Sequence, residues 1–471
     1  MDNKLNKRYG LFTAICMVVG IVMGSGIFFK AQDMLIYTGG NVWLGILAWL
    51  IGGMVMIICT FVFAIFATKY EKVNGVVDYA EAIVGKKYGF ALGWFVTTIY
   101  YPAMTAVLAW ISARYTLVLF GNTDVSGGLC IALALMYLVL NYALNMSSPK
   151  LAGKFQVSTT IIKLIPLVLM AVFGTIIGLF NGNTIENIKI ASNVGAGFDG
   201  IFGAIVAGAF AYEGWIIATS INSELKNSKK NLPIALVLGS IIVVAIYVLF
   251  FVGVTGSANV NDIINNGTHI AFENIFGSVA GTILNVFVVV SCLGTLNGLM
   301  MASTRSMYSL AIRKQGPETE RFSQIDKISN MPTNSGIIGL ALCAVWFFYF
   351  YGANLTDNIF GVFGFDSSEL PIITIYALYI PIFIVYIKKE GKKDKIKNIL
   401  LPVLAIIASL FMIFSAFYAH GIKPYNNAKS NGEFSFPILF YMVIFIIIMG
   451  IGLILDKKSN KLILDNEEIN G

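Results

Sequence analysis

The stretch Val18-Val-Gly-Ile-Val-Met-Gly-Ser-Gly-Ile-Phe-Phe29 places three glycines inside an apolar segment long enough to cross a bilayer. Glycine weakens a helix by about 1 kcal/mol relative to alanine, so Gly24-Ser25-Gly26 predicts a helix that unwinds within the membrane. Hydrocarbon cannot satisfy exposed amides, so such a break is tolerated only where it is buried in protein or lines a watery cavity. The break is therefore a candidate binding site. The alternative is a helix-packing face formed by Gly20 and Gly24.

The composition of the whole chain is that of a membrane protein. Of the 471 residues, 57% are hydrophobic and 12% are charged, and the mean hydropathy is +0.79. A membrane-spanning helix needs about 20 apolar residues. Segments of this kind lie near residues 11–37, 41–67, 90–120, 128–145, 155–180, 198–221, 233–256, 278–312, 335–351, 359–387, 399–419 and 435–455. The pattern predicts an all-α polytopic protein with twelve transmembrane helices in a lipid bilayer.

The basic residues are distributed unequally between the two sides of the predicted membrane. If the N-terminus is cytoplasmic, Lys163 lies within a span, and the external side keeps only five of the 32 basic residues, Lys30, Arg114, Lys189, Lys423 and Lys429. Cytoplasmic loops are enriched in lysine and arginine. Both termini are therefore predicted to be cytoplasmic. The net charge of +7 then reflects topology and does not indicate a nucleic-acid partner.

The remaining reactive residues form no catalytic or metal-binding pattern. Each of the five cysteines stands alone in an apolar run. His269 and His420 both fall in predicted external loops, so no histidine relay across the membrane is expected. No polar segment carries a cofactor loop, a nucleophile–base pair or a metal cluster. An enzyme is not expected, and neither is a cofactor or a bound metal.

A second glycine-flanked break occurs five spans after the first. The sequence Gly208-Ala-Phe-Ala-Tyr-Glu-Gly-Trp215 lies in the middle of the sixth predicted span. Because five is odd, the second half of the chain enters the membrane inverted relative to the first half, as in many secondary transporters. We therefore expect a five-span repeat over residues 1–190, an inverted five-span repeat over 191–390, and spans eleven and twelve with a cytoplasmic tail over 391–471. The repeat favours binding over packing at the first break.

The direction of each broken span suggests what its break could bind. The amides near Ser25, Gly26, Ile27 and Phe28 begin a half-helix whose positive dipole end faces the middle of the membrane, a suitable place for a carboxylate. In the sixth span, the first half-helix ends at Phe210 and Ala211 and offers carbonyls to an ammonium group. Together the two breaks fit the zwitterionic head of an α-amino acid.

At this level the sequence resembles the amino acid–polyamine–organocation permeases, and within them the L-type amino acid transporter branch. The matching motifs are Gly24-Ser-Gly-Ile-Phe28, Phe210-Ala-Tyr-Glu-Gly-Trp215 and Ser223-Glu-Leu-Lys-Asn-Ser-Lys-Lys-Asn-Leu-Pro233. The resemblance implies a 5+5 inverted-repeat core with discontinuous helices 1 and 6, and amino acid transport by alternating access. It implies a substrate site at Val22, Gly24, Ser25, Gly26, Ile27, Phe210, Ala211, Glu213 and Gly214, with Phe210 as a gate.

Lys163 is a charged residue about 13 Å along the fifth span from Lys154. A lysine at that depth is costly unless it is paired or neutralised, and the alternative is snorkelling to the interface. The resemblance implies that Lys163 takes the place of the cation bound by sodium-coupled relatives, near Gly20 and Ser291, with Tyr247 as a weaker member of the same network. Transport would then be independent of sodium, although coupling to protons through Lys163 stays open.

The sequence leaves the substrate class open. Sodium-independent exchange of neutral L-amino acids is the favoured function. A proton-coupled importer of cationic amino acids or polyamines is the alternative, suggested by Glu213, Asp366 and Glu369. Glu213 could instead cap the restarted helix, and Asp366 and Glu369 could equally lie near the outer mouth, because the start of the tenth span is ambiguous. A non-transporting sensor or channel is a remote third possibility. Residues 121–127 lack the cysteine found in animal members of the family, so a bacterial inner-membrane protein without a disulfide-linked heavy subunit is expected.

Overall fold

A computed structural model describes residues 10–24, 26–70, 75–122, 126–191, 199–216, 225–354 and 358–470. The first part of this chain is helical, with no β-strand among the described residues. Its helices are α1 (Leu11–Val22), α2 (Gly26–Tyr37), α3 (Val42–Lys69), α4 (Val76–Ile83), α5 (Lys86–Phe95), η1 (Val96–Tyr100), α6 (Tyr101–Leu119), α7 (Gly128–Ser147), α8 (Pro149–Leu169), η2 (Met170–Gly174), α9 (Thr175–Phe180) and α10 (Asn183–Ala191).

The second part is built in the same way. Its helices are α11 (Gly200–Tyr212), α12 (Ser228–Ser257), α13 (Val260–Asn266), α14 (His269–Phe276), α15 (Ser278–Ala311), α16 (Thr319–Phe322), α17 (Thr333–Asn354), η4 (Gly361–Phe363), α18 (Leu370–Glu390), η5 (Ile396–Leu400), α19 (Leu401–Phe417), η6 (Tyr418–Ile422), α20 (Lys423–Ser430) and α21 (Pro437–Asn470).

Ten helical segments among the described residues are long and apolar enough to cross a membrane. They coincide with ten of the predicted apolar segments, and the other two predicted segments contain the short helices α1, α2 and α11. Large apolar side chains stay exposed on the outside of the bundle, as Phe12 does at 79% and Val345 at 65%. Exposed apolar surface on this scale requires a lipid environment, so the chain is a multi-pass membrane protein.

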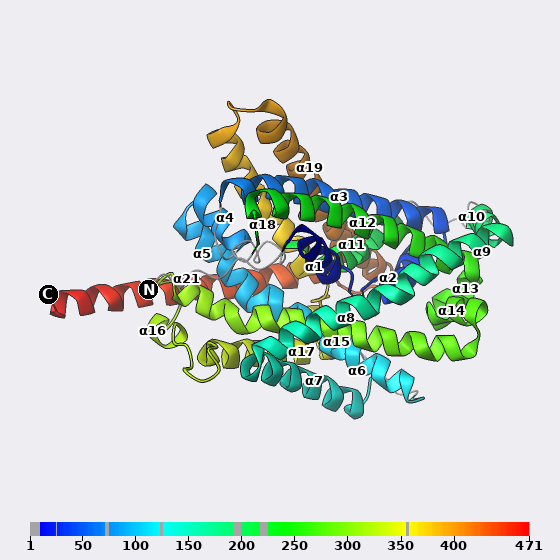
Figure 1. The fold of residues 1–471 in the computed structure, drawn as a ribbon, viewed down its shortest axis with the longest axis horizontal. Coiled ribbons are helices and arrows are strands. Elements are labelled where there is room, and N and C mark those ends of the chain that lie inside the picture. Colours follow the sequence, from blue (N-terminus) through cyan, green and yellow to red (C-terminus); the bar gives the residue numbers. More distant parts are fainter. Residues whose placement is uncertain are drawn as a thin grey trace.

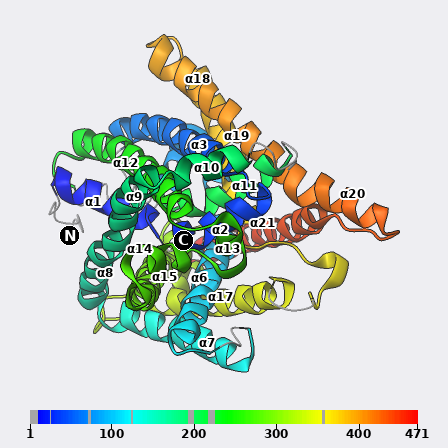
Figure 2. The ribbon, with the colours of Figure 1, turned by 90° about the vertical axis from the view of Figure 1, so that its right-hand side faces the viewer.

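The long helices run roughly parallel to one another along the molecule (Figure 1). The connecting helices collect at its two ends: α4 and α16 lie at one end, while α10, α13 and α14 lie at the other. In the view turned by 90°, α7 and α20 lie at different edges of the bundle, around the crowded centre that contains α2 and α11 (Figure 2).

Two predicted span boundaries differ from the structure. The tenth predicted segment starts at residue 359, but α18 begins only at Leu370. Residues 359–365 are apolar, but the next residue, Asp366, accepts hydrogen bonds from the backbone amides of Ser368 and Glu369, which favours a helix start at this point. The eleventh segment is longer than predicted, because helical structure continues from Ile396 through to Ser430.

Candidate functional site

The first helix is interrupted where its glycines predict a break. Helix α1 ends at Val22, and α2 begins at Gly26. The Gly24 amide donates to the Val22 carbonyl at 2.7 Å, which closes a turn that an α-helix does not contain. The amides of Gly26, Ile27 and Phe28 lie in the first turn of α2, as predicted. Amides at the start of a helix have no hydrogen-bond partner within that helix. Ser25 lies outside the described residues.

The helix in the sixth predicted span also ends early, and the described residues 213–216 that follow it are called the second interruption here. Helix α11 ends at Tyr212, and Glu213 adopts an extended conformation with φ −76° and ψ 160°. Gly214 follows with φ +105°, a left-handed region that favours glycine. The chain after Ile216, where this span would restart, lies outside the described residues.

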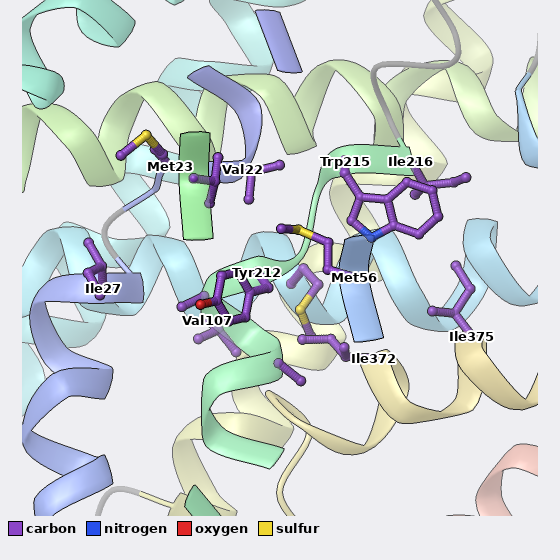
Figure 3. Close-up of a cluster of buried hydrophobic side chains, with 14 of the residues drawn as sticks. Val22, Met23, Ile27, Met56, Val107, Tyr212, Trp215, Ile216, Ile372 and Ile375 are labelled. Carbon is purple, nitrogen blue, oxygen red and sulfur yellow. The ribbon is translucent and has the colours of Figure 1, made fainter. Parts of the chain in front are cut away.

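The two interruptions meet in the centre of the bundle. A Cβ atom added at Gly26 would lie 3.0 Å from Cα of Ala211 and 3.2 Å from the ring of Phe210, so the start of α2 packs directly on the end of α11. Val22, Met23 and Ile27 from the first interruption belong to the same cluster of buried side chains as Tyr212, Trp215 and Ile216 from the second (Figure 3). Glycine at position 26 therefore allows a backbone approach that a side chain would prevent.

Tyr247, on α12, contacts both interruptions with one hydroxyl group. Its oxygen lies 3.1 Å from the carbonyl oxygen of Val22 and 3.0 Å from that of Ala211. The last carbonyls of a helix lack partners within it, and Tyr247 supplies a donor to this pair. The carbonyl of Phe210 accepts from the Glu213 amide at 3.4 Å. Among the described residues, the carbonyls of Phe210 and Ala211 each have one such partner, and a carbonyl oxygen has two lone pairs.

Lys163, on α8, is completely buried and donates a hydrogen bond from Nζ to the carbonyl oxygen of Gly20. Its buried position does not agree with the snorkelling alternative. Ser291, on α15, is also buried, and its hydroxyl has no hydrogen-bond partner among the described residues. Its neighbour Cys292 is close enough to interact electrostatically with Lys163. Gly20, Lys163 and Ser291, predicted around the ion position, thus lie on α1, α8 and α15, and α8 packs against each of the other two. Tyr247 lies on α12, which packs against α1.

Gly20 also has a packing role. A Cβ atom at this position would lie 2.2 Å from Cγ2 of Thr160 on α8, so the two helices approach closely here. At Gly24 the nearest atom would be the hydroxyl oxygen of Thr295, at 3.1 Å. The packing interpretation therefore describes Gly20, whereas Gly24 and Gly26 belong to the break itself.

The carboxylate of Glu213 is engaged within the protein. It accepts hydrogen bonds from the hydroxyl of Tyr100 and from the Gly214 amide. Tyr100 is the last residue of η1, a π-helical turn, and such turns are frequent at functional sites. Whether Glu213 caps the restarted helix, as predicted, is not tested by this contact, because that helix lies outside the described residues. Contact of Glu213 with a substrate amine is also untested.

Asp366 and Glu369 take part in contacts at the start of α18. Oδ1 of Asp366 accepts from the amide of Ser368 at 2.6 Å. The buried carboxylate of Glu369 lies 2.6 Å from Nζ of Lys30 and 3.0 Å from Nε2 of His420. The placement of His420 in an external loop is wrong: it lies in the π-helical turn η6 inside a long apolar helix. Lys30 is likewise buried, on α2.

Several residues around the interruptions carry no signal in the sequence. Met56 on α3, Val107 on α6, and Ile372 and Ile375 on α18 belong to the same cluster of buried side chains in Figure 3. Each is an apolar residue in an apolar run, so neither spacing nor residue type sets it apart. Tyr100 is similar, because one of 21 tyrosines attracts no attention until its partner Glu213 is located.

A bundle of apolar helices in which the break between α1 and α2 packs on the end of α11 is typical of multi-pass membrane permeases. A sequence profile described as amino acid permease matches residues 9–451, and the chain belongs to this family. It is therefore an amino acid transport protein and not an enzyme.

Three relatives illustrate the range of the family. The serine/threonine exchanger SteT of Bacillus subtilis is 31% identical over 88% of this chain and 92% of its own length. The human large neutral amino acids transporter small subunit 2 is 26% identical over 70% of this chain and 62% of its own length. The mouse Asc-type amino acid transporter 1 is 27% identical over 65% of this chain and 58% of its own length.

Proposed function

We propose that this protein exchanges neutral L-amino acids across the membrane by alternating access, without sodium. The observation that carries this proposal is the direct contact between the α1–α2 interruption and the end of α11, where Gly26 meets Ala211. Backbone groups at two such interruptions provide amides on one side and carbonyls on the other. The relatives that bear the names serine/threonine exchanger and large neutral amino acids transporter support neutral substrates and exchange.

In the proposed architecture, α1 and α2 together form the first span, and α11 with the residues that follow it forms the sixth. The ten long helices supply the others, which gives twelve spans. Residues 1–190 and 191–390 form the two inverted repeats, and 391–471 carries the last two spans and the tail. The matching positions of the interruptions support this division.

In the proposed binding mode, the amides of Gly26 and Ile27 at the start of α2 bind the substrate carboxylate. The carbonyls of Phe210 and Ala211 bind the ammonium group. The substrate side chain then points toward the apolar residues around the interruptions. The engaged carboxylate of Glu213 and the pairing of Glu369 with Lys30 support a neutral substrate over a cationic one, since neither carboxylate is left without a partner.

Lys163 is proposed to replace the sodium ion of related transporters. Its ammonium group supplies a positive charge to the Gly20 carbonyl at the end of α1. A lysine ammonium group can stabilise this carbonyl as a bound cation would. Transport would then need no sodium gradient. Tyr247 and the unpartnered hydroxyl of Ser291 complete the proposed network.

The proposed location is the bacterial cell membrane, with both termini in the cytoplasm and no disulfide-linked subunit. Helices α4 and α16 lie at the same end of the bundle (Figure 1). The connections that contain them are rich in basic residues, which supports a cytoplasmic position for that end.

Proteoliposomes containing the purified protein test the proposal. Uptake of radiolabelled L-threonine should rise severalfold when the vesicles are preloaded with L-serine, and should be the same in sodium and choline buffers. Uptake into empty vesicles driven by a pH gradient, with a preference for lysine or putrescine, would instead support the proton-coupled importer. Competition by all twenty amino acids at two pH values then defines the substrate range.

A further inference from the structure

A cavity of about 270 Å³ lies between α2, α6, α17 and the residues that precede α18. This volume is close to the lower limit of about 300 Å³ for small-molecule pockets in proteins. Its walls carry charges of both signs, from Arg114, Asp33 and Asp366, together with the aromatic side chains of Trp110, Tyr115 and Phe350. A cavity with paired opposite charges and an apolar wall matches the chemistry of an α-amino acid.

This cavity lies beside the proposed central site, and Val107 borders both. None of the residues proposed to bind substrate at the two interruptions lines it. The aromatic rings of Phe29 and Phe210 pack edge to face, with their centroids 5.5 Å apart, and Phe29 borders the cavity. Nζ of Lys30 lies 5.6 Å from the centre of each ring. These side chains lie between the cavity and the interruptions.

The basic side chains of the cavity differ in whether they form ion pairs with carboxylates of the protein. Lys30 is paired with Glu369 at 2.6 Å and with Asp33 at 3.2 Å. Arg114 is exposed, and no carboxylate among the described residues forms an ion pair with it. Its guanidinium lies 5.4 Å from the ring of Trp110, which orients it. A guanidinium binds a carboxylate through two parallel hydrogen bonds, so Arg114 is suited to this ligand group.

The negative charge in the cavity comes from the carboxylates of Asp33 and Asp366. The Asp33 side chain is 35% exposed, and its contact with Lys30 leaves further acceptor positions on the carboxylate. Asp366 uses Oδ1 to cap α18 and lines the cavity as well. The carboxylates of Asp33 and Asp366 can bind an ammonium group. At the same time, the guanidinium of Arg114 can bind a carboxylate group.

We propose that this cavity is a second amino acid site, at the outer entrance of the permease. Arg114 binds the α-carboxylate, Asp33 binds the α-ammonium group, and Trp110 and Phe350 contact the side chain. The site rests on the proposed transport function, and the basic-residue distribution places it on the external side. It concentrates substrate outside the Phe29–Phe210 pair before the central site opens.

Transport kinetics with Arg114→Gln provide the first test. In exchange measurements on oriented vesicles, the variant should raise the external KM for L-threonine by fivefold or more and leave the internal KM within twofold. Arg321→Gln is the matched control, because Arg321 is exposed and pairs only with the exposed Glu318 among described residues. An unchanged external KM, or an equal rise on both sides, would overturn the proposal.

Binding without transport provides the second test. Saturation-transfer NMR in nanodiscs detects weak binding of L-threonine to a Gly26→Leu variant, in which the central site is blocked. Residual binding that is lost in Gly26→Leu/Arg114→Gln supports the outer site. Absence of residual binding, or residual binding that is unaffected by Arg114→Gln, overturns it. If wild-type protein in vesicles catalyses no exchange, the proposed function is refuted. The NMR comparison then still decides whether the cavity binds amino acids.

Discussion

The ammonium group of Lys30 lies 2.6 Å from a carboxylate oxygen of Glu369, and both side chains are buried. The pair joins α2 to the start of α18, and His420 extends it to η6. It therefore connects the half-helix after the first interruption to the last part of the chain, which lies outside the proposed repeats.

Glu369→Gln should lower the thermal stability of the protein. Removing one partner of a buried ion pair costs about 3–5 kcal/mol when the other charge is left alone. Lys30 keeps its contact with Asp33, so the expected loss lies at or below the lower end of this range. The double variant Lys30→Met/Glu369→Leu should recover most of the loss. Fluorescence-detected thermal unfolding in detergent measures both, with Glu318→Gln in the exposed pair with Arg321 as the control. An unchanged Tm for Glu369→Gln would contradict the assigned role of the pair.

Tyr247→Phe should slow exchange about fivefold. The hydroxyl supplies a hydrogen-bond donor to carbonyls at both interruptions, and the loss of one such bond costs about 1 kcal/mol. Initial rates of L-threonine exchange measure the effect. Tyr425→Phe is the control, because Tyr425 is exposed and distant in sequence from both interruptions. Equal rates for the two variants would remove Tyr247 from the site.

Lys163→Met should reduce exchange at least tenfold. The variant keeps the length and apolar stem of the side chain but removes the donor to the Gly20 carbonyl. Lys154→Met, at an exposed position on the same helix, should retain wild-type activity. A fully active Lys163→Met variant would show that no positive charge is needed there, and the proposed replacement of sodium would fail.

Gly26→Leu should abolish high-affinity substrate binding while the protein still inserts and folds. The added side chain would collide with the backbone of Ala211, which cannot move as a flexible side chain could. Gly153→Leu is the matched control, since no atom lies within 4 Å of the added Cβ at that position. Binding measurements together with size-exclusion profiles separate the two effects. Unchanged binding in Gly26→Leu would return this glycine to a packing role.

Glu213→Gln should leave the ranking of amino acid substrates unchanged and lower the rate only modestly. The glutamine side-chain oxygen can still accept from Tyr100 and from the Gly214 amide. Competition assays with neutral and cationic amino acids measure the ranking, with Glu186→Gln on α10 as the control. Altered selectivity of Glu213→Gln for cationic substrates would show that the carboxylate contacts the substrate.

The interruptions could be predicted because glycine acts locally. The three glycines at 20, 24 and 26 lie within seven residues, and their effect on a helix needs no knowledge of the partner helices. The contact between Lys163 and Gly20 was expected only from the family resemblance, and the structure contains it. Whether these residues bind substrate or replace an ion stays a prediction.

Other features depend on contacts between distant parts of the chain. Lys30 and Glu369 are 339 positions apart, and His420 is 51 positions further on. Each looks like a loop residue until its partners are known, because a single charge near the end of an apolar run usually faces water. The start of α18 was misplaced for a different reason. Residues 359–365 are apolar enough to extend a span, but the capping contacts of Asp366 favour a start at Leu370.

Tyr247 carries a single hydroxyl proton but faces two carbonyl oxygens at almost equal distances. It can donate to only one of them at a time. If α11 moves away from α1, the Tyr247 hydroxyl can go on donating to the carbonyl of Val22 or to that of Ala211. The separation of the two helices therefore does not cost Tyr247 its hydrogen bond. The contact that Tyr247 makes between α1 and α11 can therefore be lost on one side while Tyr247 keeps its hydrogen bond on the other.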